Sequence, residues 1–228
     1  METTNTNKNK IYNVIILDKS GSMSSIAKQA VDGVNETLGA IRSSQLKDPT
    51  QDNYVTLVAF CGCELRTIFD NVPIAEVRDI TRKDYQPCCM TPLYDAIGKT
   101  VTKLHPIVVE NKSVAAVTII TDGYENASRE YSGKAIKDLI ESYKEEGWMF
   151  AYIGADHDVE AVAASISIDN TIDFDKTPEG TQQMFDKEKH SRGKWLQRMS
   201  MNLAPLLRVD DEERKRIFRE TSAGYFDE

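Results

Sequence analysis

The segment "DKSGS" at residues 18–22 sets an aspartate and two serines at alternate positions. Residues two apart in an extended loop point the same way, so Asp18, Ser20 and Ser22 can face one ion. Gly21 permits a backbone turn that bulkier residues resist. Oxygen donors without histidine or thiolate suit Mg²⁺, Mn²⁺ or Ca²⁺ rather than zinc. Mg²⁺ or Mn²⁺ is the better candidate, since Mg²⁺ takes few carboxylates and keeps several waters.

A second carboxylate, Asp122, follows the buried, strand-like run "SVAAVTIIT", as Asp18 follows "IYNVIIL". In an open parallel sheet the loops at the carboxyl ends of the strands form the ligand crevice. A right-handed doubly wound topology places these two strands side by side, so the two carboxylates converge. A dication held mainly by neutral hydroxyls stays electrophilic. Its open position should attract a carboxylate from another molecule.

The elements that position these residues alternate between strand and helix along the chain. Strands are predicted over residues 11–17, 53–60, 63–69, 113–122, 148–154 and 170–174, and helices over 24–45, 92–110, 129–146 and 158–166. Pro106 should kink or end the second of these helices. The fold class is therefore α/β: a three-layer, doubly wound, mostly parallel sheet. A tight hairpin at Cys61 and Gly62 makes the strand over 63–69 antiparallel and places it at an edge.

The character of the chain changes near Asp175, after which it is densely charged with apolar residues at irregular helical spacing. We predict one domain over residues 11–174 and a charged helical C-terminal extension over 175–228. We expect the extension to be dispensable for metal binding, because it lies outside the strand and helix pattern.

Three separated elements resemble the metal-ion-dependent adhesion site (MIDAS) of von Willebrand factor A (vWA) domains: "DKSGS", the threonine of "MTPLYDAI" and the D-G of "IITDGYEN". The resemblance implies that five residues surround the metal, directly or through water: Asp18, Ser20, Ser22, Thr91 and Asp122. It also implies a partner protein whose Asp or Glu completes the metal's shell. The chain looks most like compact intracellular bacterial or phage members. It departs from them at "PCCM", where a glycine is expected before the threonine.

Composition excludes several classes of function. Acidic residues outnumber basic ones 36 to 28, the net charge is −8, and Lys and Arg are scattered, which argues against nucleic acid as a partner. No apolar stretch approaches the roughly 18 residues of a membrane span, so no membrane association is expected. The N-terminal residues lack the apolar core of a signal peptide, so the protein is predicted to be cytoplasmic.

Cys61 and Cys63 form one close pair and Cys88 and Cys89 another. In a cytoplasmic chain their thiols should stay reduced. The two pairs could meet in space, but a C-x-C and a vicinal pair are poor spacing for zinc. Four small, partly buried thiols are therefore favoured over a redox pair or a metal site.

Two other interpretations of the opening segment are weaker. A phosphatase of the haloacid dehalogenase type needs a second aspartate where Ser20 stands. A helix N-cap at Ser22 or Ser24 would account for one hydroxyl only. The sequence therefore favours a divalent-metal-dependent protein-binding module, an adaptor or assembly factor with no catalysis of its own. A metal-assisted phosphate hydrolase and a mainly structural metal-binding protein remain as alternatives.

Overall fold

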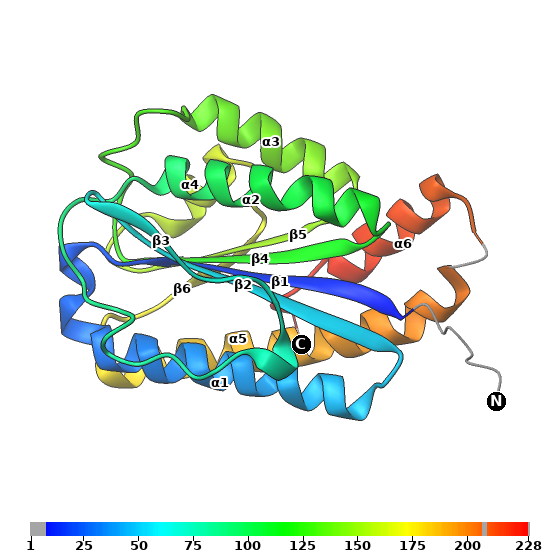
Figure 1. The fold of residues 1–228 in the computed structure, drawn as a ribbon. Helices are drawn as coiled ribbons and strands as arrows, with labels where there is room; N and C mark the ends of the chain where they lie inside the picture. Colours follow the sequence, from blue (N-terminus) through cyan, green and yellow to red (C-terminus); the bar gives the residue numbers. More distant parts are fainter. Residues whose placement is uncertain (1–7, 207–208, 228) are drawn as a thin grey trace.

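The computed structural model describes residues 8–206 and 209–227. Figure 1 shows one sheet between two layers of helices. The strands are β1 (Asn9–Asp18), β2 (Gln51–Cys61), β3 (Glu64–Pro73), β4 (Val114–Thr121), β5 (Met149–Gly154) and β6 (Asn170–Asp173). The α-helices are α1 (Ala27–Lys47), α2 (Leu93–Glu110), α3 (Gly133–Glu145), α4 (Val159–Ser165), α5 (Pro178–Leu206) and α6 (Asp211–Ser222). Two short 3₁₀ turns are η1 (Gly21–Ile26) and η2 (Ile74–Glu76).

The sheet has the strand order β3-β2-β1-β4-β5-β6, and every pair is parallel except β2 with β3. The predicted α/β class, the parallel sheet and the antiparallel edge strand are thus confirmed. The strand order reverses at β1, which lies between β2 and β4. This reversal is the switch point at which doubly wound sheets form their ligand crevice.

Strand β1 is apolar on both faces because helices cover both sides of the sheet. Ile15 and Leu17 contribute to the core beneath α1 and α5, whereas Val14 and Ile16 contribute to the opposite core beneath α2, α3 and α4. The two layers are visible in Figure 1. Alternate residues of one strand therefore hold together both halves of the fold.

Helix α2 continues through Pro106 to Glu110, so it does not end at this proline, and a kink there stays a prediction. Proline costs a helix interior about 3 kcal/mol, because it lacks the N–H donor and crowds the preceding turn. The apolar face of α2 offsets that cost by burying Val101, Leu104 and Val108 on both sides of the proline.

Helix α5 lies beside α1 under the sheet (Figure 1) and shares its core through Trp195 and Leu196. Its buried Arg192 donates hydrogen bonds to Asn13 of β1 at 3.0 Å and Thr118 of β4 at 2.6 Å. Glu188, one turn earlier on α5, accepts from Arg192 Nε at 2.9 Å. The extension predicted over 175–228 is thus bonded to the central strands, and whether the chain divides at residue 174 stays a prediction.

No helix within the described ranges is long and apolar enough to cross a membrane.

Candidate metal centre

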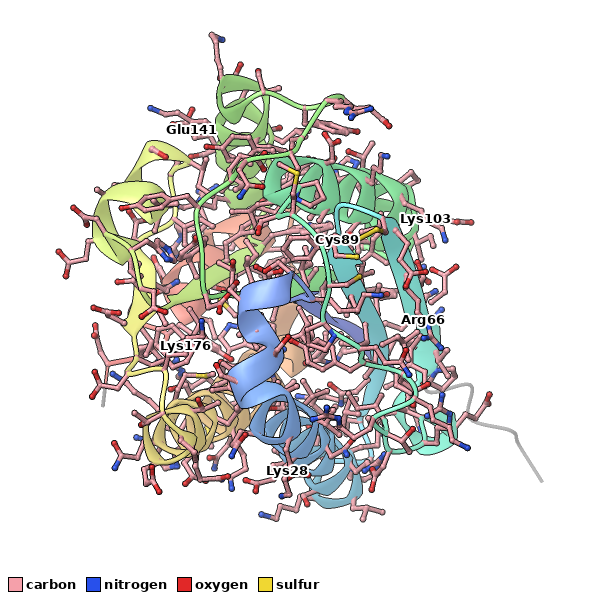
Figure 2. The ribbon with its side chains drawn as sticks, turned by 90° about the vertical axis from the view of Figure 1, so that its left-hand side faces the viewer. Lys28, Arg66, Cys89, Lys103, Glu141 and Lys176 are labelled. Carbon is pink, nitrogen blue, oxygen red and sulfur yellow. A yellow bond between two sulfur atoms is a disulfide. The ribbon has the colours of Figure 1, made fainter. Side chains whose placement is uncertain are left out.

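Asp18 and Asp122 lie at the switch point, at the carboxyl ends of adjacent strands. Leu17 is paired with Ile120 in the β1–β4 ladder, so the residues that follow each of them emerge at one edge of the sheet. Figure 2 looks onto this end of the molecule, with Lys176 and Cys89 labelled on either side of η1. The predicted convergence of the two strand ends is therefore present.

Asp18 is completely buried, and three neighbours fix its position. One carboxylate oxygen accepts from the Ser20 backbone N–H at 2.6 Å, and the other accepts from Thr121 Oγ1 at 2.6 Å. The Tyr85 hydroxyl donates to the Asp18 backbone carbonyl at 2.6 Å. Burial raises the pKa of Asp18 to about 6, although the hydrogen bonds from Thr121 and Ser20 oppose this shift. The site therefore holds a carboxylate that a nearby positive charge would stabilise.

A chain of hydrogen bonds joins the serines to Asp122. Ser20 Oγ lies 3.1 Å from Ser22 Oγ, and Ser22 Oγ donates to Asp122 Oδ1 at 2.6 Å. Ser20 and Asp122 are buried, whereas Ser22 is exposed. The oxygens thus run from the buried sheet edge to the protein surface, where a ligand from another molecule can reach them.

The second oxygen of Asp122 has no well-oriented hydrogen bond among the described residues. Instead, the ammonium of Lys176 lies 2.6 Å from Asp122 Oδ2 and 3.3 Å from Asp156 Oδ2. Burial alone would lower the pKa of Lys176, but the carboxylates of Asp122 and Asp156 raise it. A cation therefore already lies against this carboxylate.

Thr91 is buried, and its backbone is fixed from one side by Asn126. The Thr91 N–H donates to Asn126 Oδ1 at 2.9 Å, and the Asn126 N–H donates to the Thr91 carbonyl at 3.1 Å. The segment between β4 and α3 is itself held by Asp95, which accepts the N–H groups of Glu130 and Tyr131. The position of Thr91 thus depends on side chains that are themselves bonded to backbone.

The loop before Thr91 is bonded to the "DKSGS" segment. The Gly21 N–H donates to the Cys89 carbonyl at 3.1 Å, and the Cys88 N–H donates to the Lys19 carbonyl at 2.8 Å. Cys89 has φ of 69°, in the left-handed region. This is the region that glycine enters without steric cost, which accounts for the glycine expected here, although the sequence "PCCM" has a cysteine.

The donor set fits a hard divalent cation. Two buried carboxylates and two hydroxyls converge, and the carboxyl group of Asp122 acts on Asp18 as a like charge. Oxygen ligands of this kind match Mg²⁺ and Mn²⁺. Four of the five predicted ligand residues are linked by hydrogen bonds, and Thr91 is carried by a loop bonded to the same segment. The assignment of all five as metal ligands stays a prediction.

Sequence reasoning missed three residues of this centre: Thr121, Asn126 and Lys176. Thr121 precedes Asp122 directly, so its place at the strand end was a usable signal. Asn126 and Lys176 gave no local signal, because their positions depend on the path of loops and on the return of the chain after β6.

The two cysteine pairs do meet. Cys63 and Cys89 are joined by a disulfide, with Cα atoms 6.5 Å apart. Cys61 Sγ lies 3.5 Å from Cys88 Sγ. The expectation that all four thiols stay reduced is therefore wrong for Cys63 and Cys89, because the β2–β3 turn and the loop before Thr91 bring their sulfurs together.

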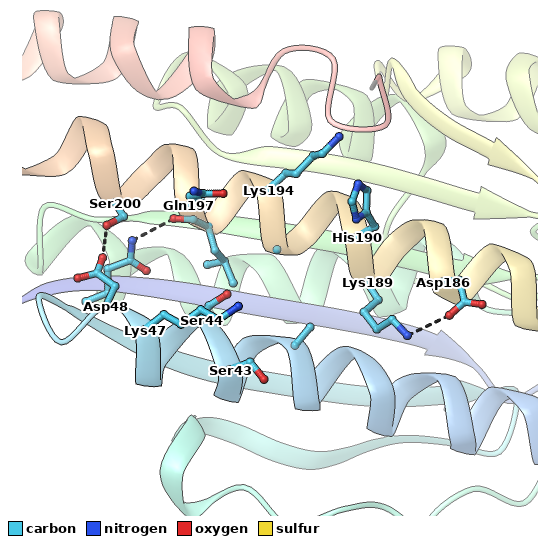
Figure 3. Close-up of a pocket in the computed structure, with 14 residues that line it drawn as sticks. Ser43, Ser44, Lys47, Asp48, Asp186, Lys189, His190, Lys194, Gln197 and Ser200 are labelled. Carbon is cyan, nitrogen blue, oxygen red and sulfur yellow. Dashed lines mark hydrogen bonds and ion pairs between the residues drawn. The ribbon is translucent and has the colours of Figure 1, made fainter.

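A pocket of about 550 Å³ lies away from this centre, between α1 and α5 (Figure 3). Its polar lining includes Asp48, which accepts from Ser200, and Lys189, which pairs with Asp186 at 2.9 Å. None of the predicted metal ligands lines this pocket, so it is not a substrate pocket of the metal centre.

Comparison with known structures supports the fold. No protein-family model and no curated protein matches the chain. A von Willebrand factor type A structure from Catenulispora acidiphila matches with TM-score 0.55 and 12% identity, over 82% of this chain and 43% of that one. The pilus adhesin SpaC from Lactobacillus rhamnosus GG matches with TM-score 0.55 and 13% identity, over 82% of this chain and 30% of that one.

A shorter neighbour, the vWA domain of SpRpn10, matches with TM-score 0.51 and 11% identity over 78% of this chain and 94% of that one. The chain spans less than half the length of the Catenulispora protein and of SpaC. At these identities the likeness concerns architecture alone, and it establishes a vWA-like fold.

Proposed function

We propose that this vWA-like chain is a divalent-metal-dependent protein-binding module in the cytoplasm, an adaptor or assembly factor rather than an enzyme. Asp18, Ser20, Ser22, Thr91 and Asp122 would hold Mg²⁺ or Mn²⁺. When bound, the ion supplies an exchangeable position for an anionic oxygen, which the Asp or Glu of a partner protein would fill.

One observation carries this proposal: a chain of oxygen donors runs from buried Asp122 to exposed Ser22 at the switch point of the sheet. Buried Asp18 and Asp122 supply the charge that fixes the ion. The serine hydroxyls supply ligand oxygens without neutralising it. Of these oxygen donors, only those at the Ser22 end face solvent, so a partner would approach from that side.

Electrostatic steering alone would not favour an acidic partner. The chain carries a net charge of −8 and would on average repel one at long range. Attraction to a carboxylate would therefore have to be local and would disappear with the metal. The same net charge disfavours nucleic acid as a partner.

Two alternatives make different demands. A metal-assisted phosphate hydrolase would need a general base beside the ion, and Ser20 stands where the phosphatase pattern has its second aspartate. With a mainly structural metal site, any partner would bind whether or not the ion is present. Turnover of a phosphate-ester panel with Mg²⁺ would favour the first, and a partner retained in EDTA would favour the second.

Metal binding itself is tested by calorimetric titration of Mg²⁺ and Mn²⁺ into the wild type and Asp18→Ala. We expect one ion per wild-type chain and none in the variant, with the far-ultraviolet circular dichroism spectrum unchanged. Asp32→Ala is the matched control, because Asp32 is a carboxylate on α1 outside the centre, paired with Lys28. Wild-type affinity in Asp18→Ala would refute the ligand assignment.

Partner binding is tested by affinity capture with mass spectrometry, with Mg²⁺ and with EDTA. Proteins retained by wild type and lost in both EDTA and Asp18→Ala are the candidates. For each, Thr91→Ala should weaken binding about tenfold, since it removes one oxygen near the ion without changing charge. Equal affinity with Mg²⁺, with EDTA and with Thr91→Ala would show that the interaction uses another face.

A further inference from the structure

Four cysteine sulfurs gather beside the metal centre. Cys61 ends β2, Cys63 precedes β3, and Cys88 and Cys89 lie in the loop before Thr91. Their four sulfur atoms all lie within 4.8 Å of one another. Figure 2 shows the sulfurs around the labelled Cys89, at the tip of the β2–β3 hairpin. Two pairs from distant parts of the chain thus form one group.

The spacing in three dimensions matches a tetrahedral thiolate site. Zinc binds cysteine sulfur at about 2.3 Å, which places the sulfurs of a tetrahedral site about 3.8 Å apart. The Cys61 and Cys88 sulfurs are 3.5 Å apart as free thiols. The argument from sequence spacing against zinc therefore no longer applies, because each cysteine pair supplies two ligands from a separate segment.

The left-handed conformation of Cys89 allows the vicinal pair to act together. In an extended chain neighbouring side chains point to opposite sides, so Cys88 and Cys89 would face apart. The φ of 69° at Cys89 breaks this alternation. A non-glycine residue in this conformation costs about 1–3 kcal/mol. A cysteine at this position can supply a sulfur ligand, which a glycine cannot.

The backbone around the sulfurs is already in place. The Gly62 N–H donates to the Met90 carbonyl at 2.7 Å, and a Cβ at Gly62 would lie only 3.1 Å from Met90 N. Lys19 pairs with Glu64 next to Cys63, so this ion pair adds no net charge beside the sulfurs. Little chain ordering would remain to oppose binding of an ion.

We propose that Cys61, Cys63, Cys88 and Cys89 in their reduced form bind one Zn²⁺, as a second metal site distinct from the oxygen centre. The Cys63–Cys89 disulfide is the oxidised form of this group. A dithiol reductant breaks the S–S bond, transfers two electrons and two protons to the sulfurs, and itself becomes a disulfide. Zinc then replaces the four thiol protons, which pass to solvent.

The test uses the full-length protein, reduced with dithiothreitol, freed of reductant without oxygen and titrated with Co²⁺ as a spectroscopic probe. We expect one equivalent to give thiolate-to-cobalt charge-transfer bands and the visible bands of tetrahedral cobalt. Added Zn²⁺ should abolish these bands. Unreduced protein should not bind at this site. Absence of thiolate bands in the reduced wild type would overturn the proposal.

Two variants separate this site from the oxygen centre. Cys61→Ser with Cys88→Ser should lose the cobalt bands, whereas Asp18→Ala should keep one equivalent. The result is therefore independent of whether the oxygen centre binds metal. If the double variant does not fold, alkylation of reduced wild type decides: Zn²⁺ should protect all four cysteines from iodoacetamide. Equal alkylation with and without Zn²⁺ would refute the proposal.

Discussion

The oxygen centre and the cysteine cluster share one loop, residues 88–91, but differ in how the fold supports them. Asp18 ends β1 and Asp122 follows β4, the two central strands of the sheet, and both residues are buried. Cys63 and Cys89 are exposed, at a hairpin tip and in a loop. The first site is thus built on the core, whereas the second is assembled at the surface by contacts between connecting segments. The loop at residues 88–91 contributes to both, so the two can influence each other.

The two sites also differ in their donor atoms and therefore in the metal ions that they select. Hard carboxylate and hydroxyl oxygens select ions such as Mg²⁺, whereas thiolates select soft or borderline ions such as Zn²⁺. Sites of such different donors can lie close together without competing for one ion. Changes to the shared scaffold should affect both sites, and changes to one donor set should affect mainly that site.

The largest effect is expected from ending the chain at residue 174. This loses α5 and with it Phe185, Trp195 and Leu196, all essentially buried. Burial of each large apolar side chain contributes about 1.5–3 kcal/mol, and the net stability of a domain is only about 5–15 kcal/mol. We expect the truncated chain to lose its circular dichroism spectrum and both metal sites. A soluble, Mg²⁺-binding chain of residues 1–174 would instead support the predicted boundary.

The sequence predicted what depends on strand ends and missed what depends on loop paths. Asp18 and Asp122 were assigned because apolar runs end at them, and β1 and β4 are neighbours as the topology rule requires. Helix α2 does not end at Pro106, because burial of its apolar face outweighs the local propensity of proline. No comparable rule applies to the cysteines, because the close spacing of Cys61 and Cys63 in the sequence does not show which distant segment packs against them. Lys176 was hidden for the same reason, since only the return of the chain after β6 brings it to Asp122.

A second prediction concerns pH and affects the oxygen centre alone. Burial raises the pKa of Asp18 to about 6 from an ordinary value near 3.8. A proton therefore competes with the ion, and Mg²⁺ affinity should fall by up to about tenfold per pH unit below 6. Calorimetry at pH 7.5, 6.0 and 5.0 measures this, and equal affinity at all three would contradict it.

The same shift sets a stability trend in the metal-free protein. Between about pH 4 and 6 the folded chain binds the Asp18 proton more tightly than the unfolded chain does. The contribution of Asp18 to the free energy of unfolding therefore falls as pH rises through this window. Asp18→Asn, which cannot titrate, is the control and should lack this part of the pH dependence.

A smaller effect is expected from Lys176→Met. The Lys176 ammonium lies 2.6 Å from Asp122 Oδ2, where it would compete with a divalent cation for the same carboxylate. Removing an ion pair of this kind is worth about 1 kcal/mol, so Mg²⁺ should bind about fivefold more tightly. Lys28→Met is the matched control, because Lys28 pairs with Asp32 away from the centre. Weaker Mg²⁺ binding in Lys176→Met would instead make the ammonium a support for the site.

The smallest effect is the coupling between the two sites. Backbone bonds from Gly21 to Cys89 and from Cys88 to Lys19 join the cysteine loop to the "DKSGS" segment. Zinc at the cysteine cluster should hold Thr91 more firmly, and we expect Mg²⁺ affinity to rise about threefold in zinc-loaded protein over reduced, zinc-free protein. Linkage requires Mg²⁺ to raise zinc affinity by the same factor, so both titrations can be run and must agree. Mg²⁺ affinities that are equal in the two forms would show that the shared loop is rigid enough without zinc. The two sites would then be neighbours that act independently.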